Sequence, residues 1–270
     1  MTLTYLYCLV RSARRPAVAG APRGMPGGDG IALVPCGDGL WLVIGHVAAR
    51  EYSEAALAEG LTDLEWVGAR ALAHEGIVQR FLSARAVLPM QLFTLFTSDA
   101  RAVEYVTAHR RSIERVLARV ERQLEWGVRV TFEASTGIER AATPTPKGKA
   151  ARRPPAESGS QSGSAYLARK RDVRAEAQQR LSRARTAGNR LYRSIKEEAT
   201  AARRSDATEY AAPGSRLVMD AAFLVPVARA AAFRASVRRQ AKDASLAGLA
   251  VSLTGPWPPY NFVGSPGRRS

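Results

Sequence analysis

The sequence predicts an α+β fold made of two small ferredoxin-like α/β domains, with helices packed on mainly antiparallel sheets. Predicted helices and strands interleave along the chain, and Asp38-Gly39 between two apolar runs is a strong hairpin signal. With 46% hydrophobic and 24% charged side chains in 270 residues, the composition is that of an ordinary globular protein. We therefore expect two small sheets, each covered by helices on one face.

The charge distribution divides the chain into two halves. Residues 1–134 carry 15 basic and 14 acidic side chains, whereas residues 135–270 carry 25 basic and 10 acidic ones. This change favours an N-terminal α/β domain over residues 1–124 and a C-terminal ferredoxin-like domain over residues 125–270. A basic half can face nucleic acid, an anionic surface or an acidic protein.

Strands and helices of the first half follow from local patterns. Aromatic and branched side chains over residues 3–10 predict a strand, and residues 31–35 and 40–47 predict a hairpin. Ser53 can cap a helix, a second helix is predicted over about 63–86, and a turn and strand over 87–96. Ser98 then caps a long predicted helix that runs to about residue 123.

The second half begins with a strongly alternating strand over residues 126–133. Residues 135–164 hold few apolar side chains and many Pro, Gly and Ser, so we expect a disordered basic loop there. A long helix is predicted over 165–204, with a possible break at Gly188-Asn189. A strand over 216–225, a helix over 227–243 and a last strand over 246–254 complete the domain.

Motifs for catalysis and for cofactors are missing from the sequence. His74-Glu75 has Val78 where a zinc protease needs a second histidine, so this pair reads as a helix-surface or capping pair. No phosphate-binding loop, nucleophile motif or cysteine cluster is present, because Cys8 and Cys36 stand alone. We therefore expect no catalytic, cofactor-binding or metal-binding residues and no enzymatic activity.

Membrane insertion and export signals are also missing. The sequence has no stretch of 18 apolar residues, so no membrane-spanning helix is expected. The apolar run over residues 3–10 precedes Arg11, Arg14 and Arg15 instead of following them, which is the reverse of a signal peptide.

The predicted helix over residues 165–204 holds 12 basic and four acidic side chains. Such a helix could bind phosphates, and a nucleic-acid-binding protein is the alternative function that this half suggests. Its two aromatic residues, Tyr166 and Tyr192, are too far apart to form a platform for stacked bases. We therefore favour a solvated face or a surface for a partner protein over nucleic-acid binding.

The segment over residues 255–263 is the most unusual local sequence. Three prolines exclude a helix or an interior strand and favour a polyproline II backbone. Trp257, Tyr260 and Phe262 would be displayed on it, either as a strap over their own domain or as anchors for a partner. We expect Trp257 to be mainly structural and Phe262 to be the stronger partner contact.

Several segments together resemble the gas vesicle protein GvpL/GvpF family over nearly the whole chain. The matching pieces are Tyr5-Leu-Tyr7-Cys8, Glu65-Trp66, Ala73-His74-Glu75-x-x-Val78, Val87-Leu-Pro89 with Thr94 and Phe96, Glu125-Trp126-Gly-Val-x-Val130, Tyr166-Leu167, Leu217-Val-Met-x-Ala-Ala-Phe-Leu-Val225 and Thr254-Gly-Pro-Trp-Pro-Pro-Tyr-Asn-Phe-Val263. The last piece is the most specific. The chain departs from the family at Gln91, Leu92 and Phe93, where Arg, Phe and Gly are usual.

This resemblance implies a function and a set of partners. Family members look like accessory or assembly proteins of gas vesicles that bind the shell protein and other accessory proteins, in the cytoplasm and at the vesicle. The family fold is similar to the two-domain α/β fold predicted above, and no catalytic residues or cofactors come with it. A shell subunit with an apolar gas-facing side needs a partner that covers this side before assembly, and exposed aromatic surface suits that task.

Overall fold

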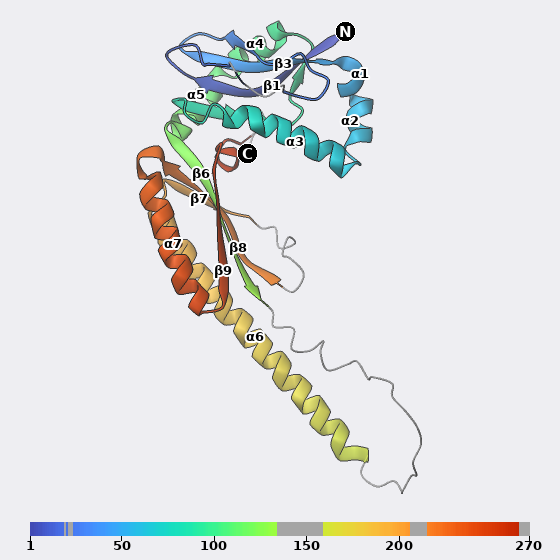
Figure 1. Ribbon diagram of the computed structural model, residues 1–270, viewed down its shortest axis with the longest axis vertical. Helices are drawn as coiled ribbons and strands as arrows, with labels where there is room; N and C mark the ends of the chain where they lie inside the picture. The colour runs from blue at the N-terminus through green and yellow to red at the C-terminus, as the bar shows by residue number, and fades with distance from the viewer. Residues whose placement is uncertain (19, 21–23, 134–158, 206–214, 265–270) are drawn as a thin grey trace.

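A computed structural model describes residues 1–18, 20, 24–133, 159–205 and 215–264 of the chain. Its strands form two antiparallel sheets, one from residues 2–96 and the other from residues 123–257. Figure 1 shows the first sheet with its helices at one end of the molecule and the second sheet, α6 and α7 at the other. The α+β fold with two small antiparallel sheets is therefore confirmed, while the division at residues 124 and 125 stays a prediction.

The first sheet has the strand order β2-β3-β1-β4, and β5 pairs with the free end of β1. This is the order of a ferredoxin-like sheet, with the first and third strands at its centre. Its strands are β1 (Thr2–Arg11), β2 (Ala32–Pro35), β3 (Leu40–Ala48), β4 (Ala86–Pro89) and β5 (Leu95–Phe96). The predicted hairpin joins β2 to β3, and Gly37, Asp38 and Gly39 all adopt the positive φ that its turn requires.

Five helices belong to this first half: α1 (Ala49–Tyr52), α2 (Glu54–Gly60), α3 (Leu64–Gln79), α4 (Asp99–Ala108) and α5 (Arg110–Val120). The side chains of Ser53, Asp63 and Ser98 accept hydrogen bonds from backbone N–H groups in the first turns of α2, α3 and α4. Two predicted helices were too long. The second ends at Gln79, and the third is interrupted at His109, whose backbone leaves the helical region.

Helices cover both faces of the first sheet, which differs from the single covered face expected for it. On one face, Tyr5 and Tyr7 of β1 pack in a cluster with Ile77 and Val78 of α3. On the other face, buried side chains of α4 and α5 pack with Leu6 and Leu9 of the same strand. Because both faces of β1 are covered, every residue from 4 to 10 is buried, which explains its continuous run of apolar side chains.

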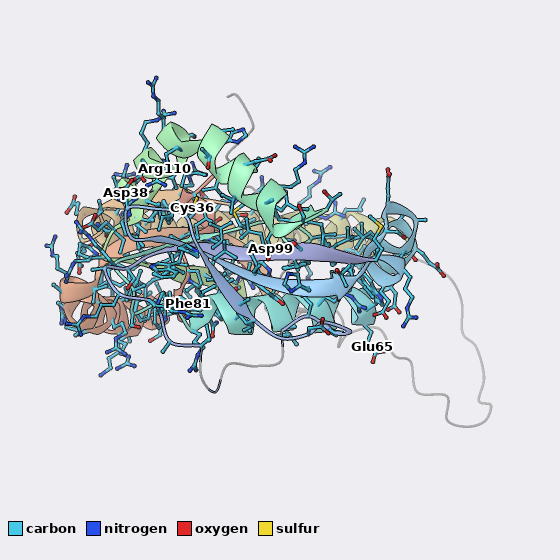
Figure 2. The ribbon with its side chains drawn as sticks, turned by 90° about the horizontal axis from the view of Figure 1, so that it is seen from above. Cys36, Asp38, Glu65, Phe81, Asp99 and Arg110 are labelled. Atoms are coloured by element: carbon cyan, nitrogen blue, oxygen red, sulfur yellow. The ribbon has the colours of Figure 1, made fainter. Side chains whose placement is uncertain are left out.

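Arg110, at the start of α5, holds the β2–β3 turn in place. Its guanidinium donates to the backbone carbonyl of Cys36 at 2.7 Å and to the Asp38 carboxylate at 2.8 Å. Figure 2 shows Arg110 beside Cys36 and Asp38 at this end of the sheet. The same guanidinium pairs with Glu114 one helical turn later, at 2.8 Å.

The second sheet has the strand order β7-β8-β6-β9, again that of a ferredoxin-like domain. Its elements are β6 (Gln123–Glu133), α6 (Gly159–Glu197), β7 (Ala201–Arg204), β8 (Ser215–Pro226), the 3₁₀ helix η2 (Val227–Arg229), α7 (Ala230–Leu246), β9 (Leu249–Trp257) and the 3₁₀ helix η3 (Tyr260–Phe262). Strand β7 was missed because it was predicted as the end of the preceding helix. Its sequence, Ala-Ala-Arg-Arg, has no strand pattern, and pairing with β8 decides its conformation.

Helix α6 is one uninterrupted helix of 39 residues, and Gly188-Asn189 does not break it. It packs on the second sheet only through its C-terminal half, where Ala184, Leu191 and Ile195 join the core cluster. Residues 166–180 are all exposed, and Figure 1 shows the N-terminal half of the helix extending beyond the sheet. Of the segment 135–164 that was expected to be disordered, residues 135–158 lie outside the described residues, and 159–164 are helical instead.

One core cluster joins the two sheets. It combines Leu6 and Leu88 of the first sheet with Leu224 of β8 and with Phe262 and Val263 of the C-terminal segment.

No helix in the described part of the chain has the length and apolar character needed to span a membrane.

Candidate functional site

The C-terminal segment runs from the last strand to the junction between the two sheets. Figure 1 shows the C-terminal end of the described chain beside α3, next to the first sheet. The segment begins at Gly255, whose φ is +117° and where a Cβ atom would lie 2.9 Å from the backbone oxygen of Glu125. No other residue type fits this close approach without displacement of the backbone.

The segment is not polyproline II, contrary to the sequence-based expectation. Strand β9 continues through Pro256 to Trp257, and residues 260–262 form a 3₁₀ turn. Proline is tolerated in β9 because β9 is an edge strand that pairs with β6 alone.

Glu125, near the start of β6, binds the turn that follows the prolines. The backbone N–H of Asn261 donates to one carboxylate oxygen at 2.8 Å, and the Asn261 side-chain amide donates to the other at 2.6 Å. Glu125 is only 5% exposed. Burial raises the pKa of its carboxyl group, and the two hydrogen bonds from Asn261 oppose that rise. Glu125 is therefore a positioning residue that holds the segment against the second sheet.

Tyr5 and His74 meet on the opposite side of the junction. The Tyr5 hydroxyl lies 2.8 Å from Nδ1 of His74 and accepts a hydrogen bond from the backbone N–H of Phe93 at 3.1 Å. We therefore assign the phenol hydrogen to Nδ1, which leaves the imidazole hydrogen on Nε2. Burial lowers the pKa of His74 to about 4, so the ring is neutral at pH 7. The Met90 backbone carbonyl acts in the opposite direction and raises the pKa of His74, although its geometry with Nε2 is too poor for a regular hydrogen bond.

A pocket of about 510 Å³ lies between these groups. It is lined by Ala71, His74, Glu75, Met90, Gln91, Leu92 and Tyr260. Three buried polar atoms at this pocket make no regular hydrogen bond to a described residue. They are Nε2 of His74, Oε1 of Glu75 and the hydroxyl oxygen of Tyr260. Burial and the nearby Glu75 carboxylate raise the pKa of Tyr260, so its phenol keeps its proton.

The polar groups of this junction have defined packing partners. The imidazole has one nitrogen occupied by Tyr5, and none of the described groups around it is an activated nucleophile. In the described part of the chain, no group of three His, Cys, Asp or Glu side chains is placed to hold a metal ion. Instead, Tyr5 links β1 to α3, and Glu125 links β6 to the C-terminal segment.

Comparison with known proteins now bears on these residues. The family model described as gas vesicle synthesis protein GvpL/GvpF matches residues 3–264. The chain belongs to this family. It is 31% identical over 267 residues to gas vesicle protein L of Streptomyces sp. (strain CB03234), which covers 97% of this chain and 93% of that protein.

Two solved GvpF structures share the fold of this GvpL/GvpF chain. The crystal structure of GvpF from Anabaena sp. PCC7120 matches with a TM-score of 0.64 and 13% identity, covering 100% of this chain and 98% of that one. GvpF from Microcystis aeruginosa matches with a TM-score of 0.60 and 12% identity, over 97% and 98%. The association with gas vesicles predicted from the motifs is thus confirmed at the level of the family.

The junction brings together family motifs that are far apart in the sequence. Tyr5, His74 and Glu75, Glu125, and Tyr260 with Asn261 come from four separate motifs and meet within one region. These pieces of the GvpL/GvpF pattern thus share a packing task, because each one contacts or adjoins another at the junction.

The structure corrects two sequence-based expectations about these residues. His74 is a buried core histidine rather than part of a helix-surface or capping pair, and its spacing of three and four residues from the apolar Ile77 and Val78 was the available signal. Phe262 is 3% exposed, so it is not displayed for a partner in this fold. Trp257 and Tyr260 are half-buried, and partner binding through them stays a prediction.

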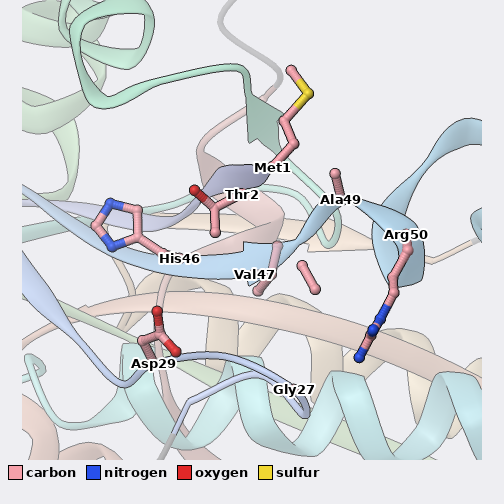
Figure 3. A pocket seen from close by; sticks show the side chains of 9 residues that line it. Met1, Thr2, Gly27, Asp29, His46, Val47, Ala49 and Arg50 are labelled. Carbon is pink, nitrogen blue, oxygen red and sulfur yellow. The ribbon is translucent and has the colours of Figure 1, made fainter.

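A second pocket lies where β1 begins and β3 ends. It has a volume of about 460 Å³ and is lined by Met1, Thr2, Gly27, Asp29, His46, Val47, Ala48, Ala49 and Arg50. Figure 3 shows the imidazole of His46 and the guanidinium of Arg50 on opposite sides of it. Thus the pocket carries charged groups of both signs, from Asp29 and Arg50.

His46 and Thr4 both bind Asp99, the first residue of α4. Nε2 of His46 lies 2.9 Å from the carboxylate, and the Thr4 hydroxyl donates to the same oxygen at 2.6 Å. Burial acts to raise the pKa of Asp99, but the Thr4 and His46 contacts outweigh it and the pKa is lowered. The Thr4 hydroxyl donates to this carboxylate, and the lowered pKa makes the carboxylate a weak base.

Proposed function

We propose that this chain is a non-enzymatic accessory protein of gas vesicles, which binds the shell protein and other accessory proteins while the organelle forms in the cytoplasm. The observation that carries the proposal is the match of the GvpL/GvpF family over residues 3–264. The junction supports it, because its polar groups have packing partners: His74 is bound by Tyr5 within the first half, and Glu125 is bound by Asn261 within the second.

The proposed binding mode follows from the nature of the cargo. A shell subunit with an apolar gas-facing side aggregates in water unless another surface covers that side. Such a cover needs exposed aromatic or aliphatic side chains rather than a catalytic cleft. Of the three candidate residues in the C-terminal segment, Trp257 and Tyr260 keep part of their surface accessible. We place the contact with the shell protein at Trp257, with Tyr260 beside it.

The test is capture of purified shell protein by the tagged, full-length chain. We expect the wild-type chain to capture it and the Trp257→Ala variant to bind about tenfold more weakly or worse, as for an aromatic anchor. Leu246→Ala is the matched control, because Leu246 is an apolar side chain with 89% exposure on another element, the end of α7. Far-UV circular dichroism shows whether each variant is folded.

Two outcomes separate the levels of this proposal. Unimpaired capture by folded Trp257→Ala would remove Trp257 as the contact and leave the accessory function intact. Failure of the wild-type chain to bind the shell protein or any purified accessory protein, with normal vesicles in cells that lack the gene, would contradict the proposed function.

A further inference from the structure

The N-terminal half of α6 extends from the protein without a packing partner among the described residues. The helix has 39 residues, and at 1.5 Å per residue it is about 58 Å long. Its C-terminal half packs on the second sheet, whereas residues 166–180 are exposed throughout. A helical segment of this length has little stability in water by itself, so packing against another surface would stabilise it.

The extended half has an apolar face. Tyr166, Val173 and Ala177 are seven and four residues apart, so they lie on one side of the helix. The same spacing continues into the packed half, where Ala184, Leu191 and Ile195 are buried against the sheet. In the extended half these side chains meet solvent: Tyr166 is 63% and Val173 42% exposed. The stripe that serves as an interface in one half thus lacks a described partner in the other.

Basic side chains border this face. Arg169 and Lys170 precede Val173 by four and three residues and lie on its two sides, whereas Arg180 follows it by seven and lies in line with the stripe, at its end. Over residues 166–180 the chain carries five basic and two acidic side chains. The carboxylate of Glu176 lies 4.0 Å from the guanidinium of Arg180 on the surface, and such an exposed ion pair contributes little to stability. The face therefore combines an apolar centre with a positively charged border.

We infer that this face, formed by Tyr166, Arg169, Lys170, Val173, Ala177 and Arg180, binds an acidic amphipathic helix of another gas vesicle protein. An apolar stripe on the partner would cover Tyr166 and Val173, and flanking Asp or Glu would pair with the basic border. The inference rests on the proposed function for one point only, namely that the partner is a gas vesicle protein.

Other occupants fit the charges poorly. A second copy of the chain would bring a basic face against a basic face. Residues 134–158 of the same chain carry five basic and two acidic side chains, so they also repel it. Nucleic acid would satisfy the Arg and Lys side chains, but Tyr166 is a single aromatic ring and cannot stack successive bases, and Val173 would stay exposed.

The test places a photo-crosslinking amino acid at Val173 of the full-length chain, expressed together with its gas vesicle proteins. The control position is Ala175, which is exposed and lies about 200° around the helix from Val173. We expect an adduct from position 173 and at most a weak one from 175. Mass spectrometry of the adduct should identify a helical segment of a gas vesicle protein with acidic side chains on both sides of an apolar stripe.

A pair of charge reversals tests the electrostatic part. Arg169→Glu with Lys170→Glu reverses the border of the face. Arg171→Glu with Arg185→Glu makes the same change in net charge at positions that are not three or four residues from any member of the face. We expect adduct yield from position 173 to fall about tenfold in the first variant and less than about twofold in the second, because ion pairs act at short range. All these side chains are exposed, so circular dichroism and melting temperature should match the parent chain.

Several results would overturn the inference. These are an adduct with a second copy of this chain, an adduct with nucleic acid, an adduct with a segment that lacks acidic flanks, equal yields from positions 173 and 175, or no adduct. Capture of the shell protein through Trp257 is measured separately. The accessory function can therefore hold while the α6 site fails, and the α6 adduct can form while Trp257 fails.

Discussion

Replacing Phe262 by alanine removes an aromatic ring from the cluster that joins the two sheets. The side chain is 3% exposed and shares this cluster with Leu224 of β8 and Leu88 of β4. Truncation of a buried Phe to Ala costs about 3–5 kcal/mol, from lost transfer free energy and the remaining cavity. Phe262 lies in a short 3₁₀ turn outside the strands, which can partly collapse into the cavity, so we expect about 3 kcal/mol.

Urea unfolding followed by far-UV circular dichroism measures this loss in the free energy of unfolding. Phe262→Leu is the matched control, because it keeps most of the volume and should cost less than about 1.5 kcal/mol. Trp257→Ala should cost less than Phe262→Ala, because Trp257 is only half-buried. If Phe262→Ala lost under about 1 kcal/mol, below the range for a buried Phe, the ring would not be part of the core that connects the sheets.

Three further changes test the junction. The free energy of unfolding should fall by up to about 3 kcal/mol as pH drops from 6.5 to about 4, because His74 takes up a proton at higher pH in the unfolded chain than in the folded one. Urea titrations at several pH values measure this dependence, and His74→Asn should flatten it. Phe93 has a φ of +64°, so Phe93→Gly should be about 1 kcal/mol more stable than Phe93→Ala, and the reverse order would exclude backbone strain there. Gln91→Arg should raise the melting temperature, because the new guanidinium can donate a hydrogen bond to the buried Oε1 of Glu75 at the pocket. Such a hydrogen bond contributes about 1 kcal/mol to the free energy of unfolding. A lower melting temperature would show that the pocket cannot hold the guanidinium.

The departures from the family pattern have a structural meaning. Phe93 occupies a left-handed backbone position, which is the conformation for which the usual family Gly is suited. Its ring lies 5.6 Å from that of Trp66, so packing offsets part of the backbone strain. Gln91 lines the same pocket as Glu75, which is where the usual Arg would find a carboxylate. Both departures thus concern one small region at the junction.

The exposed half of α6 separates two tasks within one helix. Residues near Leu191 contribute to the stability of the second sheet, whereas residues near Val173 do not. A substitution at Val173 should therefore change binding without changing folding. Binding through the exposed half of α6 and folding of the second sheet can therefore be measured separately.

Only part of the candidate site could be predicted from the sequence. The C-terminal segment was found because its prolines and aromatic residues are unusual, and the motifs containing Tyr5, His74 and Glu125 were found by resemblance. That these motifs converge could not be predicted, because their contacts join residues 69 and 136 positions apart. Local patterns carry no information about such distant partners.

Local sequence determined most of the elements of this protein. Alternating side chains fixed β6, the Asp38-Gly39 turn fixed the β2–β3 hairpin, and Ser53 and Ser98 marked helix starts, because each of these signals acts over a few residues. Tertiary structure decided the rest. It made strand β7 from Ala-Ala-Arg-Arg by pairing it with β8, and it covered both faces of the first sheet. It also turned Phe262 inward. Burial of the ring between the two sheets removes its apolar surface from water, and this lowers the free energy of the folded chain.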